Sequence, residues 1–306
     1  MFGSLATGIK DLGFRFTVSG LLPFLLLVAA AFGLAAVATG PGSPPHAVVH
    51  AGAALGVAGG VTLLALSFVL AVVSQPFQVA IVRFLEGYWG ASPAAVGARG
   101  VGVELHRRRA HRLRLAETRA RQAGELEEAG YLGRRLARYP ADPAQMLPTL
   151  LGNTLRAGER NAGERYGLDT VRAWSRLYYL LPEPFQRDVA DLHGQVDGAA
   201  RLTVALGLAG AAAVPVMAPH GWWNLTGAAL LVLAVLAYRG GVAAAAGLGT
   251  VLSACFDLNR FALTEGMRLP PPKNTAEEHL VNARLDAFLA GTEPGPLLPG
   301  VRFNHA

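Results

Sequence analysis

The chain has 306 residues, of which 52% are hydrophobic and only 16% charged, whereas an average soluble domain carries about 25% charged residues. This composition argues against an ordinary soluble domain and indicates contact with lipid. A single cysteine, Cys255, excludes an intramolecular disulfide framework and any cysteine-based zinc or iron–sulfur site within one chain. The net charge is +6, and we interpret it as a topology signal, with no nucleic-acid partner.

Two long stretches without Lys, Arg, Asp or Glu predict the membrane spans. They cover residues 16–82 and 202–238, and each is long enough for two crossings of about 20 residues. Helices are expected, because hydrocarbon cannot satisfy a free backbone. The expected spans are Val18–Val37, Ala53–Val73, Leu202–Ala218 and Trp223–Ala243. The predicted fold is an all-α integral membrane protein with four transmembrane helices, arranged as two hairpins that flank a cytoplasmic helical domain.

Apolar residues recur at helical spacing between Phe2 and Phe16, so this segment is predicted to be an amphipathic helix at the membrane interface. Lys10 and Arg15 precede an apolar run that ends in Ala-Val-Ala at residues 36–38, which resembles a signal-peptidase site. The run is long for a signal sequence and a second apolar segment follows almost at once. We therefore interpret it as a span.

Arginine distribution predicts the orientation. Residues 39–50 and 219–222 contain no Lys or Arg, whereas residues 83–201 contain 19 arginines. By the positive-inside rule, both termini and the central segment face the cytoplasm of a bacterial plasma membrane. Trp222 and Trp223 are predicted to lie in the outer aromatic belt, and Arg83 and Arg239 at the inner interface.

The second predicted span carries a ridge of small residues at four-residue spacing, Gly52, Gly56 and Gly60. Such ridges let helices approach closely, either within one chain or between two copies. The spans contain no carboxylate or lysine, which argues against a proton- or ion-coupled transporter. A passive channel remains possible, because small residues, Ser, Thr and backbone can line a pore.

After the second span, Phe77 to Tyr88 is predicted to form an interfacial helix that ends by Gly90 and Pro93. Residues 101–139 strongly favour helix and contain a basic cluster, Arg107, Arg108 and Arg109. The cluster could be a solvated face, a contact with anionic lipid or a nucleic-acid contact. Proximity to the membrane favours lipid over nucleic acid.

Short helices broken by prolines are expected between residues 139 and 185. Arg156 and Arg160 stand near Glu159 and Glu164, at spacings that allow pairing on a helix surface. Asp169 is a suitable N-cap for the helix that carries Trp174. The arginines could contact a phosphate or an anionic headgroup, or belong to a salt-bridged helical domain with an aromatic core.

The fourth span is expected to continue as a helix to about Phe261, with the uncharged run 240–256 packed against protein and not forming a fifth span. Thr275 and Glu278 predict a capping box for a last helix over residues 276–290, before a flexible tail. The predicted domains are 1–90, 91–200, 201–262 and 263–306.

No nucleotide-binding, metalloprotease or hydrolase motif occurs in the sequence. His46, His50 and His220 give only a weak indication of metal binding, and no metal or cofactor is predicted. The leading hypothesis is a non-enzymatic scaffold or regulatory protein, whose partners are anionic lipid, itself or another protein. An oligomeric channel is the first alternative. A lipid-headgroup enzyme, with its site between Asn153 and Tyr179, is the second.

Overall fold

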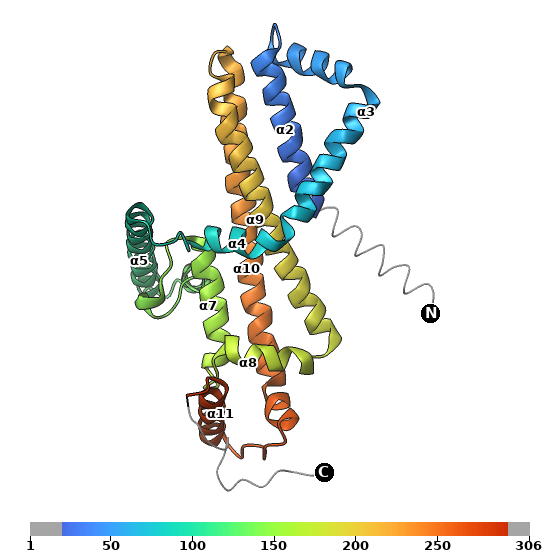
Figure 1. The fold of residues 1–306 in the computed structure, drawn as a ribbon. Coiled ribbons are helices and arrows are strands. Elements are labelled where there is room, and N and C mark those ends of the chain that lie inside the picture. The colour runs from blue at the N-terminus through green and yellow to red at the C-terminus, as the bar shows by residue number, and fades with distance from the viewer. Residues whose placement is uncertain (1–19, 293–306) are drawn as a thin grey trace. The chain divides into compact units, whose positions relative to one another are not determined.

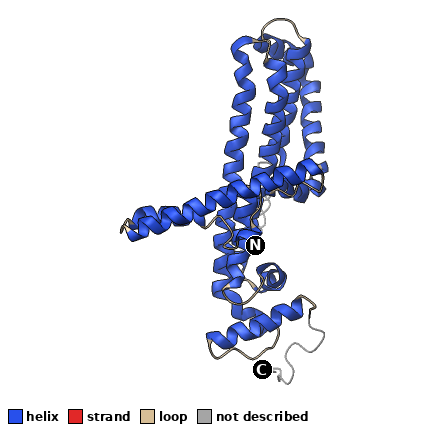
Figure 2. Ribbon diagram, turned by 90° about the vertical axis from the view of Figure 1, so that its left-hand side faces the viewer, coloured by secondary structure: helices blue, strands red, loops and turns tan. Residues whose placement is uncertain are grey.

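The computed structural model describes residues 20–292, which contain helices and loops and no β-strand (Figure 2). The predicted helix between Phe2 and Phe16 and most of the C-terminal tail lie outside these residues. The chain divides into two compact units. The first unit comprises residues 1–85 and 194–242, and the second comprises 86–193 and 243–306. The second unit therefore includes the last helices, which the sequence analysis had assigned to separate domains.

Four helices are long and apolar enough to cross a membrane, as the sequence predicts. They are α2 (Leu22–Thr39), α3 (Pro44–Val73), α9 (Glu183–Met217) and the helical stretch Gly221–Gly266, of which α10 (Leu225–Gly266) is the main part. Both α9 and α10 extend well beyond the predicted spans, so each contributes residues to both units. The uncharged run 240–256 is part of α10 and not a separate helix.

In the first unit, α2 and α3 are joined by a short turn that begins at Gly40 (Figure 1). The Gly40 backbone N–H donates to the Ala36 carbonyl at 2.8 Å, which closes the last turn of α2. A Cβ atom at Gly40 would lie 2.6 Å from that carbonyl oxygen, so the turn requires glycine. Pro44 then begins α3, where its missing N–H costs nothing.

α3 is bent at Gly56, where φ is 60° and ψ is −170°, and its change of direction is visible in Figure 1. This conformation is accessible to glycine and costly for other residues. The bend corrects the prediction of an uninterrupted ridge, because Gly52 and Gly60 lie on opposite sides of it. No atom of the described residues approaches within 4 Å of a Cβ built at any of these three glycines.

α9 and α10 also pack closely in the first unit. A Cβ atom at Gly210 would lie 2.9 Å from Leu231, and one at Gly227 would lie 3.0 Å from Val214. A buried apolar cluster joins these helices to α2 and α3 and contains Val37, Ala47, Ala213 and Met217. The backbone between α9 and α10 includes a 3₁₀ helix, Gly221–Asn224, in which the two tryptophan rings stack with centroids 4.0 Å apart.

A polar contact links α9 to α4 (Gln78–Glu86), which follows the 3₁₀ helix Gln75–Phe77. The Gln78 amide group donates to Asp197 and its oxygen accepts from Arg201. Arg201 is only 7% exposed. Gln78 therefore bridges an acid and a buried base that stand one helical turn apart on α9.

In the second unit, α5 (Pro93–Gln122) packs along α6 (Leu126–Leu136). The sequence had suggested one helix-favouring stretch over residues 101–139. The structure breaks it at Gly124, where φ is 77°. This turn lets Leu113 of α5 and Leu132 of α6 share one buried cluster.

The main core of the second unit is formed by α7 (Leu150–Glu164), α8 (Thr170–Leu177) and parts of α9, α10 and α11 (Thr275–Leu289). Short 3₁₀ helices, Pro143–Gln145 and Tyr178–Leu180, precede α7 and follow α8. Trp174 packs on Phe256, with ring centroids 6.4 Å apart, which confirms the predicted aromatic core. Asp169 caps α8 as predicted, accepting from the Arg172 backbone N–H.

The cap of α11 lies one residue earlier than predicted. Asn274 accepts from the Glu277 backbone N–H at 2.9 Å, and the Glu277 carboxylate accepts from the Lys273 backbone N–H at 2.7 Å. The predicted pair, Thr275 and Glu278, does not form the box. Glu278 is instead buried and pairs with Arg260 of α10.

Candidate functional site

The second unit contains a cleft of about 470 Å³ between α7, α8 and α11, which we call the mixed cleft. It includes Arg156 and Arg160, the two arginines that the sequence singled out in this region. Its charged lining consists of three arginines and four carboxylates: Arg156, Arg160, Arg172, Glu159, Glu164, Asp169 and Asp286. Positive and negative groups are therefore nearly balanced.

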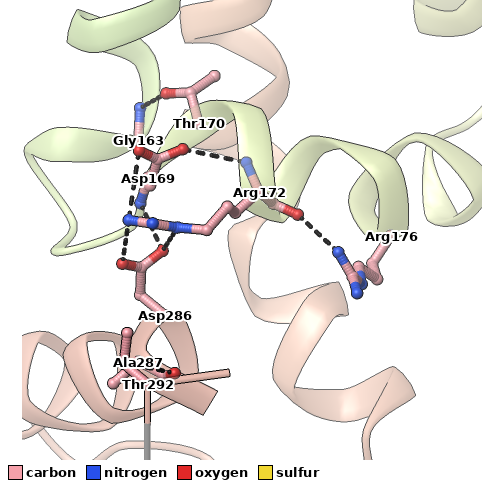
Figure 3. Close-up of polar contacts among 8 residues, drawn as sticks. All are labelled: Gly163, Asp169, Thr170, Arg172, Arg176, Asp286, Ala287 and Thr292. Carbon is pink, nitrogen blue, oxygen red and sulfur yellow. Dashed lines mark hydrogen bonds and ion pairs between the residues drawn. The ribbon is translucent and has the colours of Figure 1, made fainter. Parts of the chain in front are cut away.

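Figure 3 shows how Arg172 is held in this cleft. Its Nε and Nη2 atoms donate to the two carboxylate oxygens of Asp286 at 3.0 and 2.7 Å. The Asp169 carboxylate lies 3.4 Å from Nη2, and the Asp169 backbone N–H donates to Asp286. The hydrogen bonds to Asp286, and secondarily the negative charge of Asp169, raise the pKa of Arg172. The guanidinium serves to dock α11 on α8.

The other two arginines of the mixed cleft do not form the short-range ion pairs that their spacing allowed. Arg156 donates to the Tyr88 hydroxyl at 2.7 Å. Among the described residues, neither the pair Arg156 and Glu159 nor the pair Arg160 and Glu164 comes within ion-pair distance. The ion pair of this cleft is therefore formed by Arg172 with Asp286, which docks α11 on α8.

A second cleft, of about 450 Å³, lies between α6, α7 and α10, and we call it the basic cleft. Its charged lining residues are all arginines: Arg134, Arg138 and Arg165. The remaining polar lining is neutral and consists of Thr154, Asn161, Thr250 and Ser253. No carboxylate belongs to this lining, in contrast to the mixed cleft.

Two glycines of the basic cleft's lining, one on α7 and one on α10, approach each other closely. A Cβ atom at Gly158 of α7 would lie 2.7 Å from the Gly249 Cα atom of α10, and one at Gly249 would lie 2.9 Å from the Gly158 Cα atom. Gly247 similarly approaches Leu192 of α9. The predicted tight packing of residues 240–256 is therefore confirmed for this part of α10, with α7 and α9 as its neighbours.

The sequence analysis missed the basic cleft. Arg134 and Arg138 were readable as two nearby positive charges, but Arg138 lies just beyond the end of α6 at Leu136, so helical spacing did not show that both border one cleft. The contribution of Arg165 and of α10 was not readable, because it depends on the long-range pairing of Gly158 with Gly249.

The predicted basic cluster lies on the exposed face of α5, away from both clefts. Arg107 donates to the Pro143 carbonyl at 3.2 Å, and Arg108 pairs with Glu104 at 2.7 Å. Arg109 is exposed. The opposite face carries the buried residues Ala110, Leu113 and Ala120, which pack toward α6. The structure therefore separates these three arginines from Arg156 and Arg160.

The remaining predicted residues are placed as follows. Arg83 and Arg239 are exposed on α4 and α10, Trp222 is 68% exposed, and Trp223 packs against the apolar cluster of the first unit. The His46 and His50 rings stack at 6.2 Å. Within residues 20–292, no group of three or more His, Cys, Asp or Glu side chains is arranged to hold a metal ion.

Comparison with known proteins gave no match: neither a protein-family model, nor a curated protein, nor a solved structure resembles this chain.

Proposed function

We propose that this protein is a multi-pass scaffold or regulatory protein of a bacterial plasma membrane, with α5 as its contact with the anionic inner leaflet. In this proposal the four apolar helices span the membrane as two hairpins. The second unit is the cytoplasmic domain, and both termini are cytoplasmic.

One observation carries the proposal: α5 holds eight arginines and only two glutamates over residues 93–122. This excess of six positive charges equals the net charge of the whole chain. Seven of the arginines are exposed, namely Arg99, Arg107, Arg108, Arg109, Arg112, Arg119 and Arg121. Each basic residue near an anionic leaflet contributes about 1 kcal/mol of attraction, so several acting together suffice for stable contact.

Existing ion pairs on α5 do not remove this attraction. Arg108 with Glu104 and Arg121 with Glu117 are pairs within one helix, and both arginines remain more than 60% exposed, at 66% and 69%. Such pairs contribute less than about 1 kcal/mol and can rearrange when lipid phosphates are present. The buried residues Ala110, Leu113 and Ala120 of α5 pack toward α6, so the exposed arginines lie on the part of the helix that is left for a partner.

The test compares hydrogen exchange of α5 in two kinds of nanodisc that hold the full chain. One is made of phosphatidylcholine, and the other also contains phosphatidylglycerol. Exchange across residues 93–122 should be slower with the anionic lipid, and high salt should remove the difference. A triple Arg107→Gln, Arg108→Gln, Arg109→Gln variant should lose most of the protection.

A matched variant removes three scattered exposed arginines: Arg176→Gln, Arg187→Gln and Arg284→Gln. It changes net charge equally and should retain the protection of α5. Equal exchange of α5 in both lipids would refute the leaflet contact. Selective ion flux in proteoliposomes would favour the channel hypothesis instead.

A further inference from the structure

We propose that the basic cleft binds a phosphate group, either of a lipid headgroup or of a soluble phosphorylated molecule. The proposal is independent of the leaflet contact of α5, because it rests on different residues in a different part of the second unit. It concerns the space bordered by α6, α7 and α10, with Arg134, Arg138 and Arg165 around it.

The three arginines of the basic cleft lack strong acidic partners. Arg134 lies in the last turn of α6 and Arg138 in the turn that follows the helix, so two positive charges border the same cleft. Within the described part of the chain, neither side chain has an ion-pair or hydrogen-bond partner. Arg165 reaches Asp257 only at 3.5 Å, in a pair whose side chains are 54% and 40% exposed. Such a pair is weak, so all three guanidinium groups can turn to an anion.

The hydrogen-bonding groups of the cleft specify the ligand further. The hydroxyls of Thr154, Thr250 and Ser253 donate to backbone carbonyls one turn earlier, at 2.8, 3.1 and 3.0 Å. Their protons are therefore committed, and the donors that remain are the guanidinium groups and the Asn161 amide. Donors of this kind suit a ligand that only accepts hydrogen bonds.

Phosphate fits this donor set better than carboxylate. A phosphate monoester carries up to two negative charges and three terminal oxygens, which can receive bonds from three separate arginines. A carboxylate has one charge and two oxygens. The close contact of Gly158 with Gly249 brings α7 and α10 together beside the arginines. A volume of about 450 Å³ falls within the range of ligand pockets and accommodates the group to which the phosphate is attached.

The experiment uses the full chain in phosphatidylcholine nanodiscs and has two arms. In one arm inorganic phosphate is titrated, and in the other phosphatidate replaces part of the lipid without free phosphate. Binding is followed by slower hydrogen exchange of residues 130–138 and 154–165. Protection in the first arm identifies a soluble ligand, and protection only in the second identifies a headgroup. Protection in neither arm overturns the proposal.

Three variants locate the site. Arg134→Gln combined with Arg138→Gln should weaken binding by about tenfold or more, as expected when charge-assisted hydrogen bonds are lost. Thr250→Leu should block the cleft without changing charge and also prevent binding. Arg135→Gln is the matched control, because Arg135 stands on the same helix, stacks on Tyr131 and does not line the cleft. Equal weakening by Arg135→Gln, or full binding in Thr250→Leu, would show that the phosphate binds elsewhere.

Discussion

Arg260 of α10 and Glu278 of α11 form a buried ion pair, with 2.6 Å between Arg260 Nε and Glu278 Oε1. The side chains are only 21% and 7% exposed. The guanidinium also lies over the ring of Tyr166, 4.4 Å from its centroid, and Nη1 donates to the Asp257 carbonyl. One arginine thus joins the end of α7, the end of α10 and the last helix.

Glu278→Ala should therefore destabilise the second unit by about 3 kcal/mol, because removing one partner leaves the other charge buried without compensation. The measurement is hydrogen exchange of residues 275–289 in nanodiscs, which should become markedly faster. Glu183→Ala serves as the control, since it breaks an exposed pair with Arg187 whose side chains are 73% and 69% exposed. Its effect should stay below about 0.5 kcal/mol. Comparable effects of the two variants would contradict this assignment.

The crossing of α7 and α10 predicts that Gly158→Ala is destabilising by roughly 1–3 kcal/mol, through overpacking of backbone against backbone. The added methyl would lie 2.7 Å from the Gly249 Cα atom, which cannot rotate away. Gly240→Ala is the matched control, because no atom lies within 4 Å of a Cβ at that exposed helical position. It should be neutral or slightly stabilising. Thermal unfolding of both variants in the same detergent checks the prediction.

A pH dependence is expected from His106. Burial, and secondarily the charge of Arg109, lower the pKa of His106 below its ordinary value. Protonation of His106 is then harder in the folded state than in the unfolded chain. The contribution of the neutral side chain to stability is therefore fully present above about pH 6.5. Stability is lost as the pH falls from there toward the folded pKa.

The unfolding temperature should thus decline between pH 7.5 and pH 5.5, and His106→Gln should reduce this decline. His111→Gln, at an exposed position on the same helix, should leave it unchanged. An identical pH profile for His106→Gln and the unmodified protein would exclude this histidine as the source.

The bridge between α4 and α9 predicts a marked effect for Gln78→Leu. Loss of the amide leaves Arg201 buried without its hydrogen-bond acceptor and removes a donor from Asp197. An unsatisfied buried charged group costs roughly 3 kcal/mol. Gln75→Leu, at an exposed site one turn earlier, should have little effect on the unfolding temperature. A stable Gln78→Leu protein would mean that water or lipid replaces the amide.

Topology can be tested with single cysteines, because the native Cys255 is fully buried. In intact cells, an impermeant maleimide should label Ser43→Cys and leave Ala123→Cys unlabelled. Both positions are exposed in the structure. The expectation follows from the positive-inside rule, since Ala123 follows the arginine-rich α5 and Ser43 lies in a loop without Lys or Arg. The reverse labelling would require an inverted orientation.

Local chemistry in the sequence predicted much of the fold. The uncharged stretches predicted the four apolar helices, and Asp169 predicted the start of α8. Both predictions succeeded because hydropathy and helix capping depend on residues that are close together in the sequence. Thr275 was wrongly preferred to Asn274 as the cap of α11. Both residues are competent N-caps, and the choice was decided by Glu278, whose carboxylate is drawn to Arg260 of another helix.

The candidate clefts could be predicted less well from the sequence. Arg156 and Arg160 were identified, yet Arg156 donates to Tyr88, and it is Arg172 that pairs with the carboxylate of Asp286 on a distant helix. The basic cleft depends on Gly158 and Gly249, which are 91 positions apart and carry no side chain that would indicate a contact. Spacing along a helix predicts which residues share a face, but not which other helix meets that face.

Docking of α11 has a consequence for the order of assembly during synthesis. Glu278, Asn282 and Asp286 supply partners to Arg260, the Tyr166 carbonyl and Arg172, and these three residues leave the ribosome after all four apolar helices. The second unit cannot complete its core cotranslationally before these last residues emerge, although earlier segments usually fold first. In the proposed topology, membrane insertion therefore precedes completion of the cytoplasmic domain. A chain released before residue 275 would lack the buried carboxylate of Glu278 that pairs with Arg260 and the core side chain of Leu285, and we expect it to be a substrate for quality-control proteolysis.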